Sequence, residues 1–161
     1  METGINSYVS IEEANTYIEN YYRSNNPNRT RWGALSEEDK EILLVNACAE
    51  IELLSFTGRK AFRDQAMSFP RLPIQYGKTN EGAPDNVKKA QIELALWLSD
   101  DAKLEQQSKR KELQNQGVNS FSIGDLSESY KDGSGETPTP LMCPKAKSLL
   151  APYLNGGFET C

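Results

Sequence analysis

Along most of this chain, hydrophobic positions recur every three or four residues, which is helical spacing. Between residues 9 and 23, apolar side chains recur every three or four positions, which predicts a helix with one buried face. Ser10 and Glu13 have the spacing of a capping box at its start. The residues of that face are Ile11, Ala14, Ile18, Tyr21 and Tyr22. Turn-forming residues follow at 24–28, and we expect Trp32 to anchor the next loop in the core.

A second helix is expected to start after Ser36, where three acidic residues suit the positive end of the helix dipole. From Ile42 to Phe56 nearly every residue is apolar. The exceptions are Asn46, Glu50, Glu52 and Ser55. A helix with so little polar surface is buried on most sides. We therefore expect it to be the central helix, with Cys48 in the core.

Residues 56–71, called the joint below, must turn the chain between this helix and the next one. Gly58 suits a helix end that needs a positive φ. Pro70 removes a backbone donor and restricts the residue before it, so no helix can run through this point. The apolar anchors of the joint are Phe56, Phe62, Met67 and Phe69.

A third helix is expected to begin at Pro84, which suits a first helical turn. Its apolar stripe is Val87, Ala90, Leu94, Ala95 and Leu98, with Trp97 beside it. From Lys103 to Gln116 the residues are almost all polar. Two interpretations remain, an exposed helical rod and a helix end that frays into a loop, and the composition favours the second.

The period then changes from helical to alternating, which predicts a β-hairpin at about residues 119–130 with its turn at Gly124-Asp125. Residues 131–139 are a Gly/Ser/Thr/Pro linker. A C-terminal helix at about 144–154 is too short to fold alone, so we expect it to dock on the helical core. Residues 155–161 form a tail.

The predicted fold class is therefore mainly α, a small helical bundle of about four helices with one β-hairpin and extended termini. With 161 residues, the chain is long enough for a core, and we expect a single domain over 1–154. No run of eighteen apolar residues and no signal peptide is present, so we expect neither a membrane span nor secretion. Three cysteines without CxxC spacing fit a reducing compartment.

The sequence contains no histidine, so it lacks the usual general base near neutral pH and the commonest metal ligand. Acidic groups occur at 37–41 and at Asp100-Asp101, but carboxylates at a helix start usually interact with the dipole. We expect no enzyme activity, no catalytic residue, no metal and no cofactor.

The net charge of −5 is unevenly distributed. Residues 1–55 carry −6, residues 56–78 carry +4, and residues 79–161 carry −3. With their aromatic neighbours, Arg59, Arg63 and Arg71 could contact single-stranded nucleic acid. Alternatively, the arginines pair with acids of the first two helices, and the acidic balance of the chain favours this interpretation.

The order of these parts resembles a tailed-phage family of head–tail connector proteins, also called adaptor or head-completion proteins. The resemblance spans about Tyr8 to Leu154 and is moderately specific. It rests on Tyr8-Val9-Ser10, Glu13-Ala14, Tyr17, Trp32, Lys40, Ala47, Ile51, Phe56, Gly58, Arg59, Gln65, Met67, Phe69-Pro70-Arg71, Pro84, Val87, Lys88, Ala90, the hairpin around Gly124 and Leu150-Ala151-Pro152-Tyr153-Leu154. Phe69 stands where a tryptophan is common in the family.

The resemblance implies a structural virion protein of which about a dozen copies form a ring under the portal, in the neck of the virion. The ring would line part of the DNA channel and contact the portal and a tail-side connector or stopper protein. Assembly would occur in the host cytoplasm, and the isolated protein can be a monomer. An acidic surface suits a channel that DNA passes through without sequence-specific contact.

In such connectors the C-terminal segment is expected to contact the portal or a neighbour, which here points to Tyr153, Leu154 and Phe158. A disordered tail is the alternative for the last residues. Members of this kind are also described as DnaT-like single-stranded DNA-binding proteins. The alternative function is therefore a single-stranded DNA-binding module.

Overall fold

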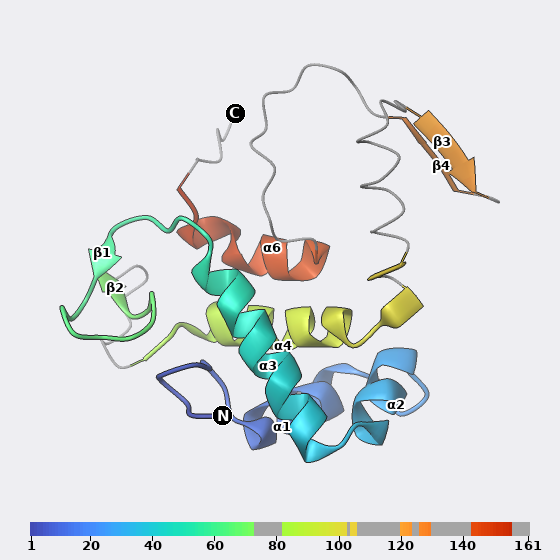
Figure 1. Cartoon of the computed structure of the whole chain (residues 1–161), viewed down its shortest axis with the longest axis horizontal. Coiled ribbons are helices and arrows are strands. Elements are labelled where there is room, and N and C mark those ends of the chain that lie inside the picture. Colours follow the sequence, from blue (N-terminus) through green and yellow to red (C-terminus); the bar gives the residue numbers. More distant parts are fainter. Residues whose placement is uncertain (73–81, 103, 106–119, 124–125, 130–142, 156–161) are drawn as a thin grey trace. The chain divides into compact units, whose positions relative to one another are not determined.

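The computed structural model describes residues 1–72, 82–102, 104–105, 120–123, 126–129 and 143–155 (Figure 1). The chain forms two compact units, Met1–Ser99 with Pro140–Cys161 and, separately, Asp100–Thr139. The described part is mostly helical with an antiparallel hairpin, so the predicted fold class is confirmed. None of its helices has the length and apolar character needed to cross a membrane.

Five α-helices build the described part of the first unit. They are α1 (Ile11–Tyr21), α2 (Pro27–Ala34), α3 (Glu37–Glu52), α4 (Asp85–Leu98) and α6 (Pro144–Leu150), and a 3-10 turn, η2 (Ala151–Tyr153), follows α6. α4 packs against both α3 and α6, while α1 contacts α3 and α4. Figure 1 shows α3 crossing α4, with α6 along α4. The centre of the fold is therefore α4.

The prediction that the helix at 42–56 is central and buried on most sides is wrong. α3 ends at Glu52, and Ile42 and Leu53 are 51% and 76% exposed. Its buried residues are Leu44, Ala47, Cys48 and Ile51. The apolar residues of this segment lie on two opposite faces, because positions 42, 45, 49 and 53 also recur at helical spacing. Only one of these two faces packs on the core.

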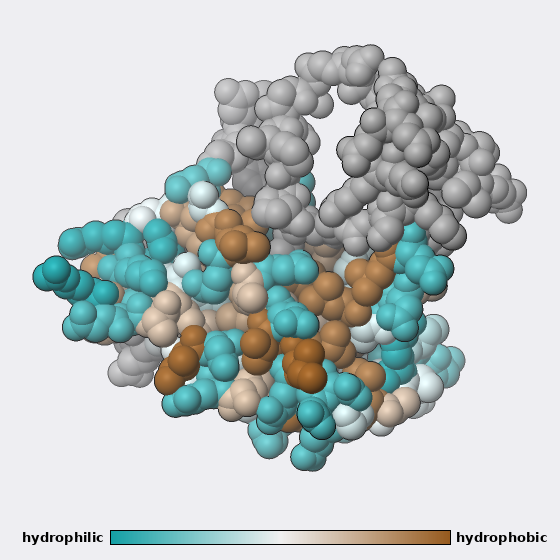
Figure 2. Space-filling view, in the orientation of Figure 1, coloured by the Kyte–Doolittle hydropathy of each residue, from teal (hydrophilic) through white to brown (hydrophobic). Residues whose placement is uncertain are grey.

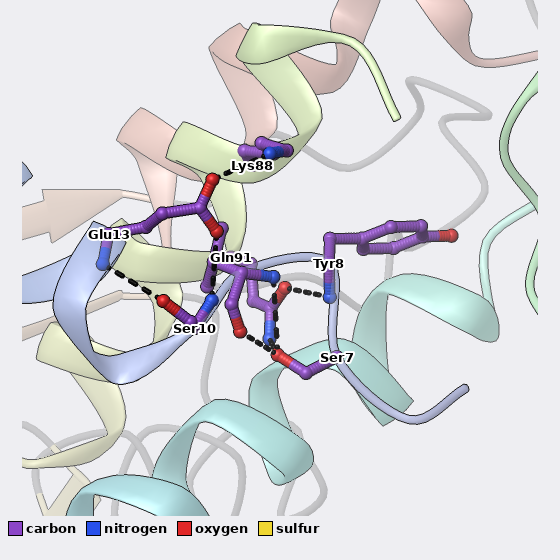
Figure 3. Close-up of polar contacts among 7 residues, drawn as sticks. Ser7, Tyr8, Ser10, Glu13, Lys88 and Gln91 are labelled. Carbon is purple, nitrogen blue, oxygen red and sulfur yellow. Dashed lines mark hydrogen bonds and ion pairs between the residues drawn. The ribbon is translucent and has the colours of Figure 1, made fainter. Parts of the chain in front are cut away.

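The predicted start of α1 is confirmed. The Ser10 side chain accepts a hydrogen bond from the Glu13 amide, and the Glu13 carboxylate accepts one from the Ser10 amide. The other oxygen of Glu13 accepts from Lys88 at 2.7 Å, so this cap also joins α1 to α4 (Figure 3). Ala14, Tyr17 and Ile18 form the buried face.

Trp32 is buried at 3% exposure, as predicted, but it belongs to a helix rather than a loop. Pro27 occupies the first turn of α2, and Asn26 accepts a hydrogen bond from the Asn28 amide. These are helix-start features, which the turn interpretation of the same residues overlooked. The Trp32 indole donates to Asn15 of α1 at 2.8 Å.

The joint contains two short strands that the sequence did not predict. β1 (Arg59–Lys60) pairs antiparallel with β2 (Arg71–Leu72). Gly58 has the expected positive φ, 74°, but it lies in the turn before β1 and beyond the end of α3. Phe56, Met67 and Phe69 are buried as expected. Phe62 is 55% exposed, so its prediction as a core anchor is wrong.

α6 begins at Pro144 and packs on α4, which confirms that the C-terminal helix docks on the helical core. Ala146 and Leu150 are completely buried. The helix ends at Leu150, and the remaining predicted turn is η2.

In the second unit, β3 (Ser120–Ile123) pairs antiparallel with β4 (Leu126–Ser129), with Ile123 opposite Leu126. This pairing confirms the predicted hairpin. The predicted turn residues 124–125, the linker at 131–139, most of the polar segment at 103–116 and tail residues 156–161 lie outside the described residues.

Candidate interaction site

The joint is closed by one arginine side chain. The Arg71 guanidinium donates to the carbonyl oxygens of Phe56, Thr57, Gly58 and Ser68, at 3.2, 2.7, 2.6 and 3.3 Å. It also lies over the Phe56 ring, 5.9 Å from the ring centroid. The planar guanidinium with its five N–H donors suits this arrangement of acceptors. Arg71 therefore holds the first residues of the joint, 56–58, against its last residues, 68–71.

An aromatic cluster lies beneath this arginine. The Phe69 ring packs edge-on against Phe56, Tyr153 and Tyr8, with centroid distances of 4.8, 5.5 and 6.1 Å. These rings come from the N-terminal segment, the joint and η2. Edge-to-face aromatic pairs add about 0.5–1.5 kcal/mol each to the stabilisation by burial. Phe69 is consequently the packing centre of this end of the unit.

The C-terminal residues complete the same cluster. The Thr57 amide donates to the Tyr153 carbonyl at 2.8 Å, and the Asn155 amide donates to the Ser55 carbonyl at 2.9 Å. Phe56 and Leu154 form an isolated antiparallel bridge. Tyr153 and Leu154 are half-buried contacts within the protein, and Phe158 lies outside the described residues. Of the three predicted portal contacts, the two described residues therefore pack within the protein and remain partly exposed.

An exposed basic tip projects from the joint; it consists of Arg59, Lys60, Phe62 and Arg63. The Lys60 ammonium donates to the carbonyl oxygens of Gln65 and Ala66, both at 3.3 Å. The Gln65 side chain accepts from the Phe62 amide and donates to the carbonyls of Met67 and Pro70, at 2.9, 2.7 and 3.1 Å. Gln65 thus fixes the tip on the joint.

The structure separates the three arginines proposed for nucleic-acid contact. Arg59 and Arg63 are both exposed on the tip, whereas Arg71 is engaged with backbone carbonyls. The alternative pairing with acids of the first two helices is wrong for Arg71. Among the described residues, Arg59 and Arg63 also have no carboxylate within ion-pair distance.

Sequence reasoning missed three polar clusters, one partly buried and two buried, that hold the first unit together. The first surrounds Glu52 at the end of α3. One of its carboxylate oxygens accepts from the Tyr8 hydroxyl, and the other accepts from the Ser68 amide and hydroxyl, both at 2.9 Å. Burial, followed by the hydrogen bond to Glu52, raises the pKa of Tyr8 well above its usual range. Glu52 ties the N-terminal segment and the joint to α3.

The second cluster is centred on Gln91, which is fully buried in α4. Its side-chain oxygen accepts from the Tyr8 amide at 2.8 Å, and its nitrogen donates to the Ser7 hydroxyl and the Leu44 carbonyl, both at 2.8 Å. Figure 3 shows the Gln91 side chain reaching Ser7 and Tyr8 in the N-terminal segment. Every hydrogen bond of this amide crosses to another element.

The third cluster is centred on Glu93, also in α4 and 4% exposed. It accepts hydrogen bonds from the hydroxyls of Tyr17 and Tyr22 and from the Lys145 ammonium, each at 2.6 Å. Burial first, then the hydrogen bonds to Glu93, raise the pKa of both tyrosines. Burial alone would lower the pKa of Lys145, but its bonds to Glu93 and Tyr22 raise it. This cluster joins α1, α4 and α6.

A sequence signal for these clusters exists in α4. Gln91 and Glu93 interrupt an apolar run, and a polar residue buried in a helix needs partners. The partners could not be predicted, because they lie 47 to 84 residues away along the chain. Groups of three or more potential metal ligands do not occur among the described residues.

Comparison with known proteins identifies the family. The model of the family described as "Putative DnaT-like ssDNA binding protein" matches residues 1–160. The chain belongs to this family. No curated protein and no solved structure matches the chain.

Proposed function

We propose that this chain is a structural head–tail connector of a tailed phage that assembles as a ring beneath the portal. The observation that carries the proposal is the division of the chain into a helical unit and a separate hairpin unit. An isolated two-stranded hairpin is marginally stable in water. A hairpin unit of this kind is suited to pairing with neighbouring copies in an assembly.

The helical unit fits the same role. Its elements are joined by polar clusters at Glu52, which is partly buried, and at Gln91 and Glu93, which are buried. Such hydrogen bonds fix the orientation of helices more specifically than apolar packing alone. A ring subunit needs this rigidity, since small errors in each contact accumulate around the ring. The resemblance of the joint and C-terminal segment to connector proteins points to the same function.

The test is to locate the chain in virions of the phage that encodes it. We expect electron microscopy of the neck to show a ring of this fold between portal and tail. A matched sample with the gene deleted should yield filled heads without attached tails. Wild-type virions whose neck lacks this chain would overturn the proposal.

The second candidate is a single-stranded DNA-binding module, and the family description favours it. The tip exposes Arg59 and Arg63 together with Phe62, a combination that can contact phosphates and stack on a base. The net charge of −5 opposes it, because phosphate binding normally accompanies a basic surplus.

Oligonucleotide binding distinguishes the two functions. A DNA-binding tip requires affinity that decreases steeply with salt and is lost when Arg59 and Arg63 are both changed to Ala. Arg71→Ala is unsuitable for this test, since it removes the hydrogen bonds that close the joint. For a connector we expect no affinity above the weak, sequence-independent background at about 0.15 M salt.

A further inference from the structure

α3 has a second apolar face, called the outer stripe below, which consists of Ile42, Val45, Ala49 and Leu53. Ile42, Ala49 and Leu53 are exposed and Val45 is half-buried. Figure 2 shows brown, hydrophobic patches along the course of α3, on the side facing the viewer. A helix buries one apolar face against its own core, so a second apolar face suits contact with another protein.

The outer stripe has an acidic end. Glu37, Glu38 and Asp39 are exposed in the first turn of α3. Glu38 lies four residues before Ile42 and therefore on the same face of the helix. A partner of this end should combine an apolar side chain with positive charge.

The basic tip has this combination. Phe62 is 55% exposed and stands between Arg59 and Arg63, both exposed. The tip follows the C-terminal end of α3, whereas the acidic end is at the N-terminus of that helix. The tip therefore cannot reach the acidic end of its own α3. The sixteen residues of α3 span about 24 Å at 1.5 Å per residue. A second copy of the chain can present its tip there.

We infer that the basic tip of one copy docks on the acidic end of the outer stripe of the next copy. Phe62 then contacts Ile42, and Arg59 and Arg63 face Glu38 at the acidic end. The two surfaces differ, so the contact is heterologous, the type of contact that builds a ring when its rotation closes. This inference rests on the ring in the proposed function and specifies its subunit contact.

A cross-linking experiment tests the contact with the full chain in a Cys161→Ser background, since Cys48 and Cys143 are buried. One protein carries Phe62→Cys and the other Ile42→Cys. Mixed at high concentration and low salt with a mild added oxidant that takes up the two electrons, they should form a disulfide-linked dimer that neither forms alone. Thr16→Cys, at an exposed position on α1, is the control partner and should give no product.

Charge reversal tests the polar part of the contact. Glu38→Arg in the Ile42→Cys protein should reduce the mixed product at least severalfold, and Arg63→Glu in its partner should restore it. Disulfide formation between two Ile42→Cys copies would show an isologous contact and overturn the inference, as would the absence of mixed product. Failure of the cross-link to form when a single-stranded oligonucleotide is present during the reaction, at the same salt, would assign the tip to nucleic acid instead.

Experiments on variant virions distinguish this inference from the proposed function. Glu38→Arg should lower the occupancy of the neck, with Arg63→Glu restoring it and with the melting temperature unchanged. Full occupancy in the Glu38→Arg virion would overturn the docking and leave the connector function standing. A chain that cross-links as described but is missing from the wild-type neck would overturn the connector function and leave the contact standing.

Discussion

α3 and α4 have similar apolar content in sequence, yet they play different roles. Six consecutive residues of α4, 91–96, are buried, and two of them are polar. α3 buries a single face and leaves Ile42 exposed on the opposite one. In the buried stretch of α4, the two polar residues form hydrogen bonds to other elements. In α3, apolar residues occur on two faces, and only one of these faces is buried.

The largest changes in stability are expected in the core. Leu94→Ala in α4 and Leu44→Ala on the inner face of α3 should each lower the free energy of unfolding by about 2–5 kcal/mol, because both side chains are buried. Ile42→Ala, on the outer face of α3, is the matched control and should change it by less than about 0.5 kcal/mol. Chemical denaturation measures all three. A large loss for Ile42→Ala would show that the outer face is part of the core.

A somewhat smaller effect is expected from the polar centre of α4. Glu93→Ala removes the acceptor of two tyrosine hydroxyls and should cost about 1–3 kcal/mol for each buried hydroxyl left without a partner. Lys145 is half exposed and can turn to water, so its loss adds little. Glu93→Gln retains one acceptor and should cost less than Glu93→Ala. Equal stability of Glu93→Ala and wild type would contradict the structural role of this cluster.

The pH dependence of unfolding at alkaline pH tests the same cluster. In the folded protein, burial and Glu93 raise the pKa of Tyr17 and Tyr22 above the ordinary value of 10.0. The folded state therefore retains these protons where the unfolded state has lost them. Their contribution to stability is complete below about pH 10 and decreases as the pH rises further. Tyr17→Phe should flatten this decrease in melting temperature between about pH 9 and 11. An unchanged slope would contradict the assignment.

The smallest expected effect is on Cys48. Burial raises the pKa of this thiol to about 12, and its side chain is 2% exposed. Reagents that modify thiolates should leave Cys48 unmodified in the native protein at pH 8 and react with it after denaturation. Mass spectrometry of digested protein gives the readout. Rapid native labelling would show that the inner face of α3 opens easily.

Local features could be predicted from the sequence because their causes are local. The capping box at Ser10 and the hairpin with Ile123 opposite Leu126 depend on neighbouring residues. The role of α3 could not be predicted, because its pattern does not show which apolar face meets the core. From the sequence, Arg71 was a candidate for pairing with acids of the first two helices or for contact with nucleic acid, and only the folded joint brings four carbonyls around it. Burial and long-range partners follow from the assembled fold.

Arg71 also determines which substitutions the joint can tolerate. Its hydrogen bonds to four carbonyl oxygens need a planar, forked donor group, whereas a lysine offers a single ammonium. Variation among natural sequences should therefore be strict at position 71, where even lysine is a poor replacement. At positions 59 and 63, lysine can supply the same charge, because these side chains do not have to match a fixed set of acceptors as Arg71 does. Three basic positions that a composition-based score treats alike are thus under different constraints: position 71 through folding, and positions 59 and 63 through the binding proposed for the tip.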